Sequence, residues 1–186
     1  SHELPEGSEF RCLVDEIVSA SVRSADLTRQ LLVYARNTPV APGRVDLNEV
    51  VRSALTLFQR ASSPQITKIA SLHSESLVIQ ADRSLLENAC LNLFLNARDA
   101  LPRGGKLTVR TCALEQVSNT AQLEAGHYAE LTVKDSGAGI PPEALSHIFE
   151  PFFTTKEVGR GTGLGLAAVL GAVRGINGHI DVDSVP

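Results

Sequence analysis

The sequence of 186 residues lacks several features that mark common protein classes. No apolar run approaches the roughly 18 residues that a membrane span needs, and the first residues show no cationic and apolar leader. Cysteine is scarce: Cys12, Cys90 and Cys112 are odd in number, widely separated and set in apolar stretches, so we expect buried thiols without a metal or disulfide role. These absences favour a protein of the reducing cytoplasm.

A surplus of positive charge is also missing. The net charge is -4 and no basic stripe occurs, which argues against a nucleic-acid-binding surface. Two common phosphate-binding loops are absent, because no GxxxxGK[ST] is present and the glycines between Gly159 and Gly165 do not satisfy GxGxxG. Any anion that this chain binds must therefore be held locally.

The N-terminal part has the pattern of a coiled-coil helix. Between Phe10 and Arg36 apolar residues recur at alternating spacings of four and three, without proline or glycine, which predicts one long helix that buries a stripe against another helix. Residues 37–44 contain two prolines and a glycine and are typical of a linker. We therefore expect three parts: a separate N-terminal part with the long helix at residues 1–37, a linker at 38–44 and a main domain at 45–186.

The main domain is predicted to mix helices and strands. A helix is expected over Leu47–Ala61, and Asp82 is a suitable cap for a second, long helix that ends at Leu101. A third helix is expected over Leu164–Gly175. Strands are expected at residues 66–74, 76–81, 104–114, 127–135 and 178–184. The order of elements predicts an α+β sandwich, with one sheet covered by helices on one face.

Four short blocks stand in order in this domain. They are NLFLNARDAL (Asn92–Leu101), DSGAGI (Asp135–Ile140), FEPFF (Phe149–Phe153) and GTGLGL (Gly161–Leu166). Together they resemble the N, G1, F and G2 boxes of sensor histidine kinases, a branch of the GHKL ATP-binding superfamily that includes gyrase, Hsp90 and MutL. The segment RSADLTRQLLVYAR also resembles the second helix of the dimerisation and phosphoacceptor hairpin in nitrogen-regulatory and hybrid kinases.

This resemblance implies a fold and an activity. The fold would be a two-layer α/β sandwich with a mixed, mostly antiparallel sheet covered by helices on one face, preceded by a long coiled-coil-type helix. The activity would be transfer of the γ-phosphoryl group of ATP, with Mg²⁺, to a histidine outside the fragment for relay to a response regulator or receiver domain. The full-length protein would form a homodimer through the N-terminal helix and be cytoplasmic or membrane-anchored, with no membrane contact by this fragment.

Asn92 and Asn96 are four residues apart and project from one helical face. Amide oxygen suits Mg²⁺, and the resemblance assigns the metal to Asn96; the alternative is a pair of capping or solvent-facing amides. ATP-hydrolysing members of the superfamily carry a glutamate base where Asn92 stands. An amide cannot accept a proton at neutral pH, so phosphoryl transfer is favoured over hydrolysis, and Arg98 is a candidate phosphate contact.

Asp135 follows an apolar strand and enters a glycine-rich turn. Its carboxylate could accept a hydrogen bond from the exocyclic amine of adenine, while Gly137 and Gly139 allow close backbone approach or positive φ. The alternative is a turn without a ligand.

The segment between the last two blocks is predicted to be a lid over the nucleotide. The phenylalanines of the block before it, Phe149 and either Phe152 or Phe153, would be buried and anchor one end of this lid, TTKEVGR. Lys156 and Arg160 could reach phosphates, or could be solvated loop charges. We expect Asn92, Asn96 and Lys156 to be catalytic. The expected ATP contacts are Asn96, Arg98, Asp135, Gly137, Gly139, Phe149, Lys156, Arg160, Gly161, Thr162, Gly163, Leu164 and Gly165.

The phosphoacceptor histidine is not expected within this sequence. His2 lies in SHEL, which resembles an acceptor box, but Pro5 and Gly7 follow too soon and the surrounding residues fit a hairpin loop better. The fragment is expected to lack the acceptor helix and to stop before a further glycine-rich segment and closing strand. Two other functions stay open: a GHKL-type ATPase or clamp, and a non-catalytic kinase-like interaction module.

Overall fold

The computed structural model describes residues 13–14, 42–116, 123–156 and 161–185. The chain divides into two units, Ser1–Asn37 and Thr38–Pro186. The helix predicted for residues 10–36 lies outside the described residues, apart from Leu13 and Val14, which are helical. The elements named below belong to the second unit.

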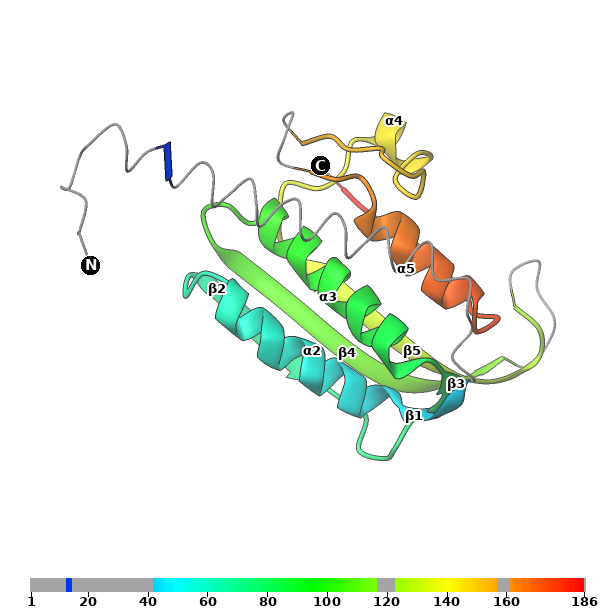
Figure 1. Cartoon of the computed structure of the whole chain (residues 1–186). Coiled ribbons are helices and arrows are strands. Elements are labelled where there is room, and N and C mark those ends of the chain that lie inside the picture. The colour runs from blue at the N-terminus through cyan, green and yellow to red at the C-terminus, as the bar shows by residue number, and fades with distance from the viewer. Residues whose placement is uncertain (1–12, 15–41, 117–122, 157–160, 186) are drawn as a thin grey trace. The chain divides into compact units, whose positions relative to one another are not determined.

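The second unit alternates helices and strands in the order shown in Figure 1. The elements are β1 (Gly43–Asp46), α2 (Leu47–Ala61), β2 (Ile66–Ser71), β3 (Val78–Ala81), α3 (Arg83–Ala100), β4 (Gly105–Gln116), β5 (Gly126–Asp135), α4 (Pro142–Leu145) and α5 (Gly165–Arg174).

The strands form two small sheets. In the three-stranded sheet β4 is central, parallel to β2 and antiparallel to β5, while β1 and β3 form an antiparallel pair. Helices α2 and α3 lie on one face of the three-stranded sheet (Figure 1). The predicted α+β sandwich with helices on one face is therefore confirmed, with its strands divided between two sheets.

Three details of the strand prediction need correction. Strands β2 and β3 follow each other in sequence but belong to different sheets, and β1 begins at Gly43, inside the range predicted as linker. Residues 178–184 form no strand. Their alternating pattern suits a strand, but a strand also needs a ladder partner; here Ser184 Oγ instead accepts a hydrogen bond from Ile140 N at 2.9 Å.

Helices α2 and α3 build the core through their apolar faces. In α2, buried residues recur at helical spacing, from Leu47 through Val51 and Ala54 to Phe58. Phe58 meets Phe94 of α3 with ring centroids 5.8 Å apart in a tilted arrangement, and both side chains are fully buried. Aromatic pairs of this kind add about 0.5–1.5 kcal/mol beyond area burial, so α3 is fixed firmly against α2.

The ends of α3 are those predicted from the sequence. Asp82 Oδ1 accepts hydrogen bonds from the backbone N–H groups of Ser84 and Leu85 at 2.8 and 3.2 Å, which caps the helix. Leu101 closes the other end, and Gly104, with φ of 87°, turns the chain into β4. This fixed helix carries the asparagines of the first block toward α5.

Candidate nucleotide-binding site

One face of α3 carries three polar side chains in its second half. Asn92, Asn96 and Asp99 are spaced by four and three residues and so share this face; we call them the α3 polar stripe. A Cβ placed on Gly165, the first residue of α5, would lie 3.8 Å from Asn92 Cγ and from Asn96 Nδ2. The start of α5 therefore packs against the two asparagines, and the first and last sequence blocks meet.

The two amides make different contacts. Asn92 Nδ2 donates to Gly165 O at 3.4 Å, so this amide helps to hold the first turn of α5. Asn96 is half-buried and makes no side-chain hydrogen bond to the described residues. None of the described residues donates a hydrogen bond to its amide oxygen.

The N-terminus of α5 faces this stripe without a side-chain cap. Leu164 occupies the cap position and is buried, with 5% of its surface exposed, and its N–H donates to Thr162 Oγ1 at 3.4 Å. Backbone N–H groups at the start of a helix attract anions. The helix start and the α3 amides thus offer donors and a neutral oxygen ligand side by side.

Asp135 lies at the end of β5 near the end of α3. Asp135 Oδ1 accepts from Gly137 N at 2.8 Å, which leaves the second carboxylate oxygen for another donor. A Cβ on Gly137 would come within 2.6 Å of Ala100 Cβ, so only glycine fits against the last turn of α3. Gly139 has φ of 73°, a left-handed backbone conformation that glycine adopts more readily than other residues.

Lys156, which follows the third sequence block, contacts the α3 polar stripe at Asp99. Its Nζ lies 2.6 Å from Asp99 Oδ2, and Arg98 binds the other oxygen, Asp99 Oδ1, through Nε and Nη2 at 2.9 and 2.8 Å. Burial raises the pKa of Asp99, but the hydrogen bonds from Lys156 and Arg98 outweigh it, and the pKa lies below its ordinary value. Asp99 is therefore an anion that holds two cations.

Arg98 is also tied to α2. Its Nη1 donates to Ala61 O at 3.3 Å, where α2 ends. The structure thus places this predicted phosphate contact between two helices, joined to Lys156 through Asp99.

The phenylalanines are arranged differently from the predicted anchor. Phe149 and Phe153 are half-buried, whereas Phe152 is 68% exposed, with φ of 69°. The buried residue of this segment is its neighbour Ile148, at 7% exposure. Phe153 contacts the ring of His147, with centroids 5.7 Å apart. Among the described residues, Phe149 makes no hydrogen bond or ring contact with the stripe, and its role as an ATP contact stays a prediction.

A backbone hydrogen bond draws together the residues on either side of the predicted lid. Phe152 N donates to Gly163 O at 2.9 Å. Gly163 has φ of 66°, and a Cβ there would collide with the backbone of Phe152, so glycine is required. Within the predicted lid, Arg160 lies outside the described residues.

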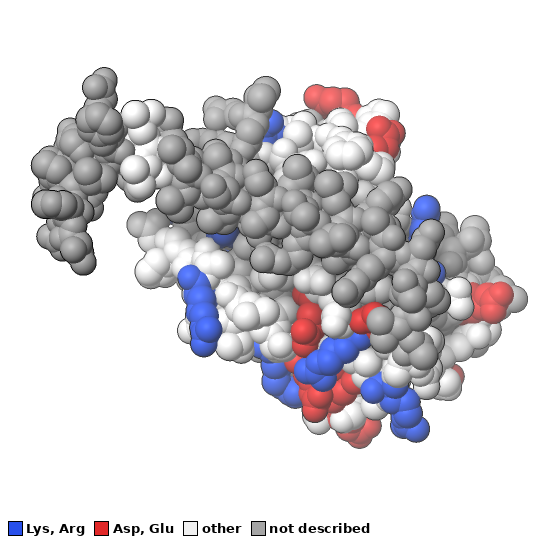
Figure 2. Space-filling model, viewed as in Figure 1, with Lys and Arg blue, Asp and Glu red and all other residues white. Residues whose placement is uncertain are grey.

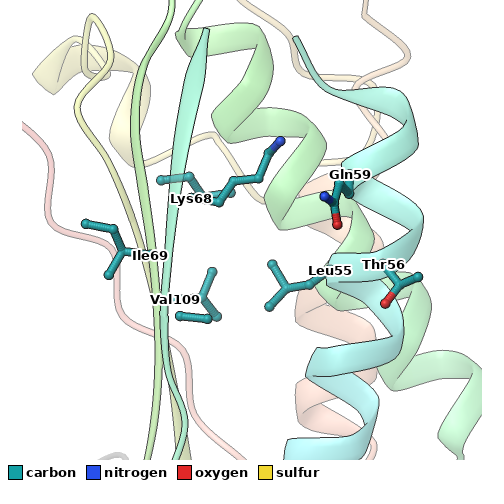
Figure 3. Close-up of a pocket in the computed structure, with 8 residues that line it drawn as sticks. Leu55, Thr56, Gln59, Lys68, Ile69 and Val109 are labelled. Carbon is teal, nitrogen blue, oxygen red and sulfur yellow. The ribbon is translucent and has the colours of Figure 1, made fainter. Parts of the chain in front are cut away.

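A pocket of about 320 Å³ lies in a different part of the domain, between α2 and strands β2 and β4 (Figure 3). Aliphatic residues dominate its lining, among them Leu55, Leu107 and Val109, and Lys68 is the charged residue that lines it. Lys68 Nζ lies 5.9 Å from the centroid of the Phe58 ring. None of the predicted nucleotide contacts lines this pocket, which also lacks the carboxylate and amides of the site on α3.

Charged side chains at the start of α3 are paired with each other. Arg83 Nη1 lies 3.1 Å from Glu49 Oε2, and Arg83 Nε lies 3.0 Å from Glu87 Oε1. Figure 2 shows positive and negative side chains interspersed in this part of the surface. Exposed pairs of this kind contribute little to stability, typically up to about 1 kcal/mol.

Among the described cysteines and histidines, Cys90 is buried and two histidines are paired with carboxylates. Burial raises the pKa of the Cys90 thiol to about 12, so it is not a nucleophile at neutral pH, while Cys112 is partly exposed. His147 pairs with Glu150 at 2.8 Å and His179 with Asp181 at 2.9 Å. His2 and Cys12 lie outside the described residues.

The residues present fit a magnesium nucleotide. Asn96 offers an amide oxygen of the kind that Mg²⁺ accepts beside phosphates and waters, and Asp135 offers a carboxylate oxygen to an amine. Lys156 and the uncapped start of α5 supply positive charge and N–H donors for phosphates. Asp99, which holds Lys156, had been given no role from the sequence, although its spacing from Asn92 and Asn96 indicated the same face.

The fold and this site define an α+β domain in which helix side chains and a glycine-rich turn offer ligands suited to a nucleotide. Residues 81–186 match the family described as "Histidine kinase-, DNA gyrase B-, and HSP90-like ATPase". The chain belongs to this family, which confirms the resemblance of the four sequence blocks.

Relatives and solved structures point to one branch of the family. The chain is 39% identical over 166 residues to "Sensor kinase CckA" of Brucella abortus, covering 87% of this chain and 18% of that protein. A "Mycobacterial sensor histidine kinase MprB" structure has a TM-score of 0.58 and 33% identity, covering 73% of this chain and 80% of that one. The structure of full-length ShkA in complex with AMPPNP has a TM-score of 0.65 and 25% identity, and the match covers 90% of this chain and 34% of ShkA.

This chain therefore spans less than a fifth of the length of CckA. In the part of the chain that the structure describes, no helix combines the length and apolar character required to cross a membrane.

Proposed function

We propose that this chain is the ATP-binding catalytic portion of a two-component sensor histidine kinase. It would transfer the γ-phosphoryl group of ATP to a histidine outside the catalytic domain, for relay to a response regulator or receiver domain. The observation that carries the proposal is the contact of the α5 start with Asn92 and Asn96, beside an ion-paired lysine. The ShkA structure contains AMPPNP, which supports an adenine nucleotide as the ligand here.

Each residue has a proposed task. Asp135 would accept the adenine amine through its second carboxylate oxygen, and this would select adenine over guanine, which carries an acceptor at that position. Asn96 would hold Mg²⁺, which neutralises phosphate charge when bound. Lys156, the N-terminus of α5 and residues 161–165 would bind phosphates, with Gly137 keeping the floor of the site close to α3.

The amide at position 92 favours phosphoryl transfer over hydrolysis. Asn92 donates to Gly165 O and cannot take a proton from water at neutral pH. The chain would therefore contribute positioning and charge, and the acceptor histidine would supply the nucleophile. Its ring nitrogen would form the new bond to phosphorus while the bond to the β-phosphate oxygen breaks.

The domain limits and the setting belong to the same proposal. Residues 1–37 would be the hairpin loop and second helix of a dimerisation and phosphoacceptor domain, joined by a linker to the catalytic domain from residue 45. The full-length protein would be a homodimer whose catalytic part lies in the cytoplasm. No nucleic acid or membrane contact is proposed for this chain.

Calorimetric titration with ATP, with and without Mg²⁺, tests the proposal. We expect Mg²⁺-dependent binding by the chain and formation of phosphohistidine when a protein with an acceptor helix is added. Absence of ATP binding would refute the nucleotide site. Binding without phosphohistidine would favour an interaction module, and sustained ATP turnover by the chain alone would favour an ATPase or clamp.

A further inference from the structure

Asp99 joins residues that are far apart in sequence. Its Oδ2 accepts from Lys156 Nζ at 2.6 Å, and its Oδ1 accepts from Arg98. The Asp99 side chain keeps 28% of its surface exposed and Lys156 keeps 34%, so the pair is partly shielded from water. A partly shielded pair with short hydrogen bonds restrains a lysine more than an ion pair on the open surface does.

The stem of Lys156 also lies against Gly161. A Cβ on Gly161 would lie 3.2 Å from Lys156 Cδ and 3.3 Å from its Cβ, and it would collide with Thr154 Oγ1. Lys156 N donates to Thr154 Oγ1 at 3.2 Å. Thr154 thus holds the backbone of Lys156, Gly161 lies against the stem of its side chain, and Asp99 on α3 accepts from its ammonium group.

The position of Asp99 places this ammonium near the proposed phosphate site. Asp99 lies one helical turn beyond Asn96 on the α3 polar stripe, and the start of α5 packs against the other end of that stripe. A lysine ammonium has three donors, so Lys156 can keep its bond to Asp99 while it donates to another oxygen. Arg98 occupies the other oxygen of Asp99, so one carboxylate is matched by two cations.

We propose that Asp99 is a positioning residue that holds the Lys156 ammonium beside Asn96, ready for the phosphates of the nucleotide. The inference rests on the proposed function, because it assumes that phosphates bind at this stripe. Without Asp99 the lysine would have to be ordered when the nucleotide binds. The free-energy cost of fixing one long side chain corresponds to about a two- to tenfold loss of affinity.

The test is a calorimetric comparison of Mg-ATP and adenosine binding to four chains: the unaltered chain, Asp99→Asn, Lys156→Met and the double variant. We expect Asp99→Asn to weaken Mg-ATP binding about two- to tenfold and to leave adenosine binding unchanged, because Lys156 acts on phosphates. In the Lys156→Met background, Asp99→Asn should have no further weakening effect. Asp99→Glu, which keeps the charge, should recover part of the affinity.

Glu49→Gln is the matched control, because it removes a carboxylate from an exposed ion pair at the start of α3. It should leave Mg-ATP affinity unchanged. A purely structural role of Asp99 would weaken adenosine binding as well, and that result would overturn the proposal. Equal or tighter Mg-ATP binding by Asp99→Asn would also overturn it, as would the same loss in the presence and absence of Lys156.

A measurement without nucleotide separates this inference from the proposed function. Acetylation of lysines by acetic anhydride, followed by mass spectrometry, should modify Lys156 faster in Asp99→Asn than in the unaltered chain, with Lys68 as an internal reference. An unchanged rate at Lys156 would overturn the positioning role even if ATP binds. Absence of Mg-ATP binding by the unaltered chain would overturn the proposed function, whatever the acetylation rate.

Discussion

Two asparagine side chains in different regions of this domain differ in burial and in hydrogen bonding. Asn48 at the start of α2 is 1% exposed, and its amide donates to the carbonyls of His73 and Glu75 and accepts from Thr111 Oγ1. Asn96 on α3 is half-buried and makes no side-chain hydrogen bond to the described residues.

The difference separates an amide that builds the fold from one that serves a site. A buried amide must have its partners inside the protein, because an unsatisfied buried group costs about 1–3 kcal/mol. A partly exposed amide beside a helix N-terminus can instead exchange water for a ligand. Substitutions in the region of Asn48 should therefore affect stability, and those around Asn96 should affect nucleotide binding.

The largest effect is expected from Asn48→Ala. The substitution removes three hydrogen bonds and leaves the carbonyls of His73 and Glu75 without this donor, so the free energy of unfolding should fall by about 3 kcal/mol. Urea unfolding followed by circular dichroism measures it. Asn88→Ala, at an exposed position of α3, should change stability by less than about 1 kcal/mol. Equal losses of stability in the two variants would contradict the structural role of the buried Asn48 amide.

Gly163→Ala should affect both stability and binding. The alanine would adopt φ of 66° and press against the backbone of Phe152, at a cost of about 2 kcal/mol or more, and phosphate binding should weaken with it. Gly171→Ala is the matched control, because a Cβ there meets nothing within 4 Å. In the interior of α5 it should raise stability by about 0.5–1 kcal/mol. Thermal unfolding that ranks the two variants the other way would contradict the structure.

Asp135→Asn should weaken ATP binding while stability stays nearly constant. A hydrogen bond to a charged acceptor contributes about 1.5–3 kcal/mol, so the dissociation constant should rise roughly ten- to a hundredfold. Asp183→Asn, at an exposed position near the end of the chain, is the control. Calorimetry that shows the same affinity for the unaltered chain and Asp135→Asn would place adenine elsewhere.

Asn96→Ala should reduce the benefit of Mg²⁺ rather than stability. Loss of one oxygen ligand should remove roughly 1 kcal/mol, several-fold in affinity, from Mg-ATP binding, with little effect on ATP in the presence of EDTA. The free energy of unfolding should stay within about 0.5 kcal/mol. An equal loss with and without Mg²⁺ would argue against a metal role for this amide.

The smallest expected effect is on the pH dependence of stability and comes from Asp46. Burial raises the pKa of Asp46, but hydrogen bonds from Asn48 N and Leu77 N outweigh it, and the pKa is lowered. The stability from this carboxylate is complete above its unfolded pKa of about 3.9 and is lost as pH falls through the lower folded value. Asp46→Asn should therefore be less stable at pH 7, by less than about 1 kcal/mol, and the difference should shrink as the pH falls below the folded pKa of Asp46. A constant difference would exclude the charge as its cause.

Much of the fold followed from local patterns. The helix at Leu47–Ala61, the Asp82 cap of α3 and the end of α3 at Leu101 all depend on residues close together in the sequence, so the sequence predicted them closely. Pairing of strands depends on contacts across the chain. The parallel pairing of β2 with β4 and the absence of a strand at 178–184 were therefore not predicted.

The site was predicted in its parts but not in its connections. The spacing of Asn92 and Asn96 indicated one face, yet it could not show that α5 begins against them. The same limit applies to the pair of Lys156 and Asp99, which are 57 residues apart in sequence. The sequence also left open whether Phe152 or Phe153 would be buried, because hydrophobicity favours burial of both. The positive φ of Phe152 and its backbone hydrogen bond with Gly163 fix its position, and its side chain is exposed.

The central claim is that nucleotide binds at the α3 polar stripe and not elsewhere in the domain. Titration of the isotopically labelled chain with Mg-ATP, followed by backbone amide NMR shifts, tests it directly. We predict the largest shifts at Asn96, Asp135, Gly137 and Gly165, with little change at Asn48 and Thr111. Shifts centred on the pocket beside Lys68, or no shifts at saturating Mg-ATP, would contradict it.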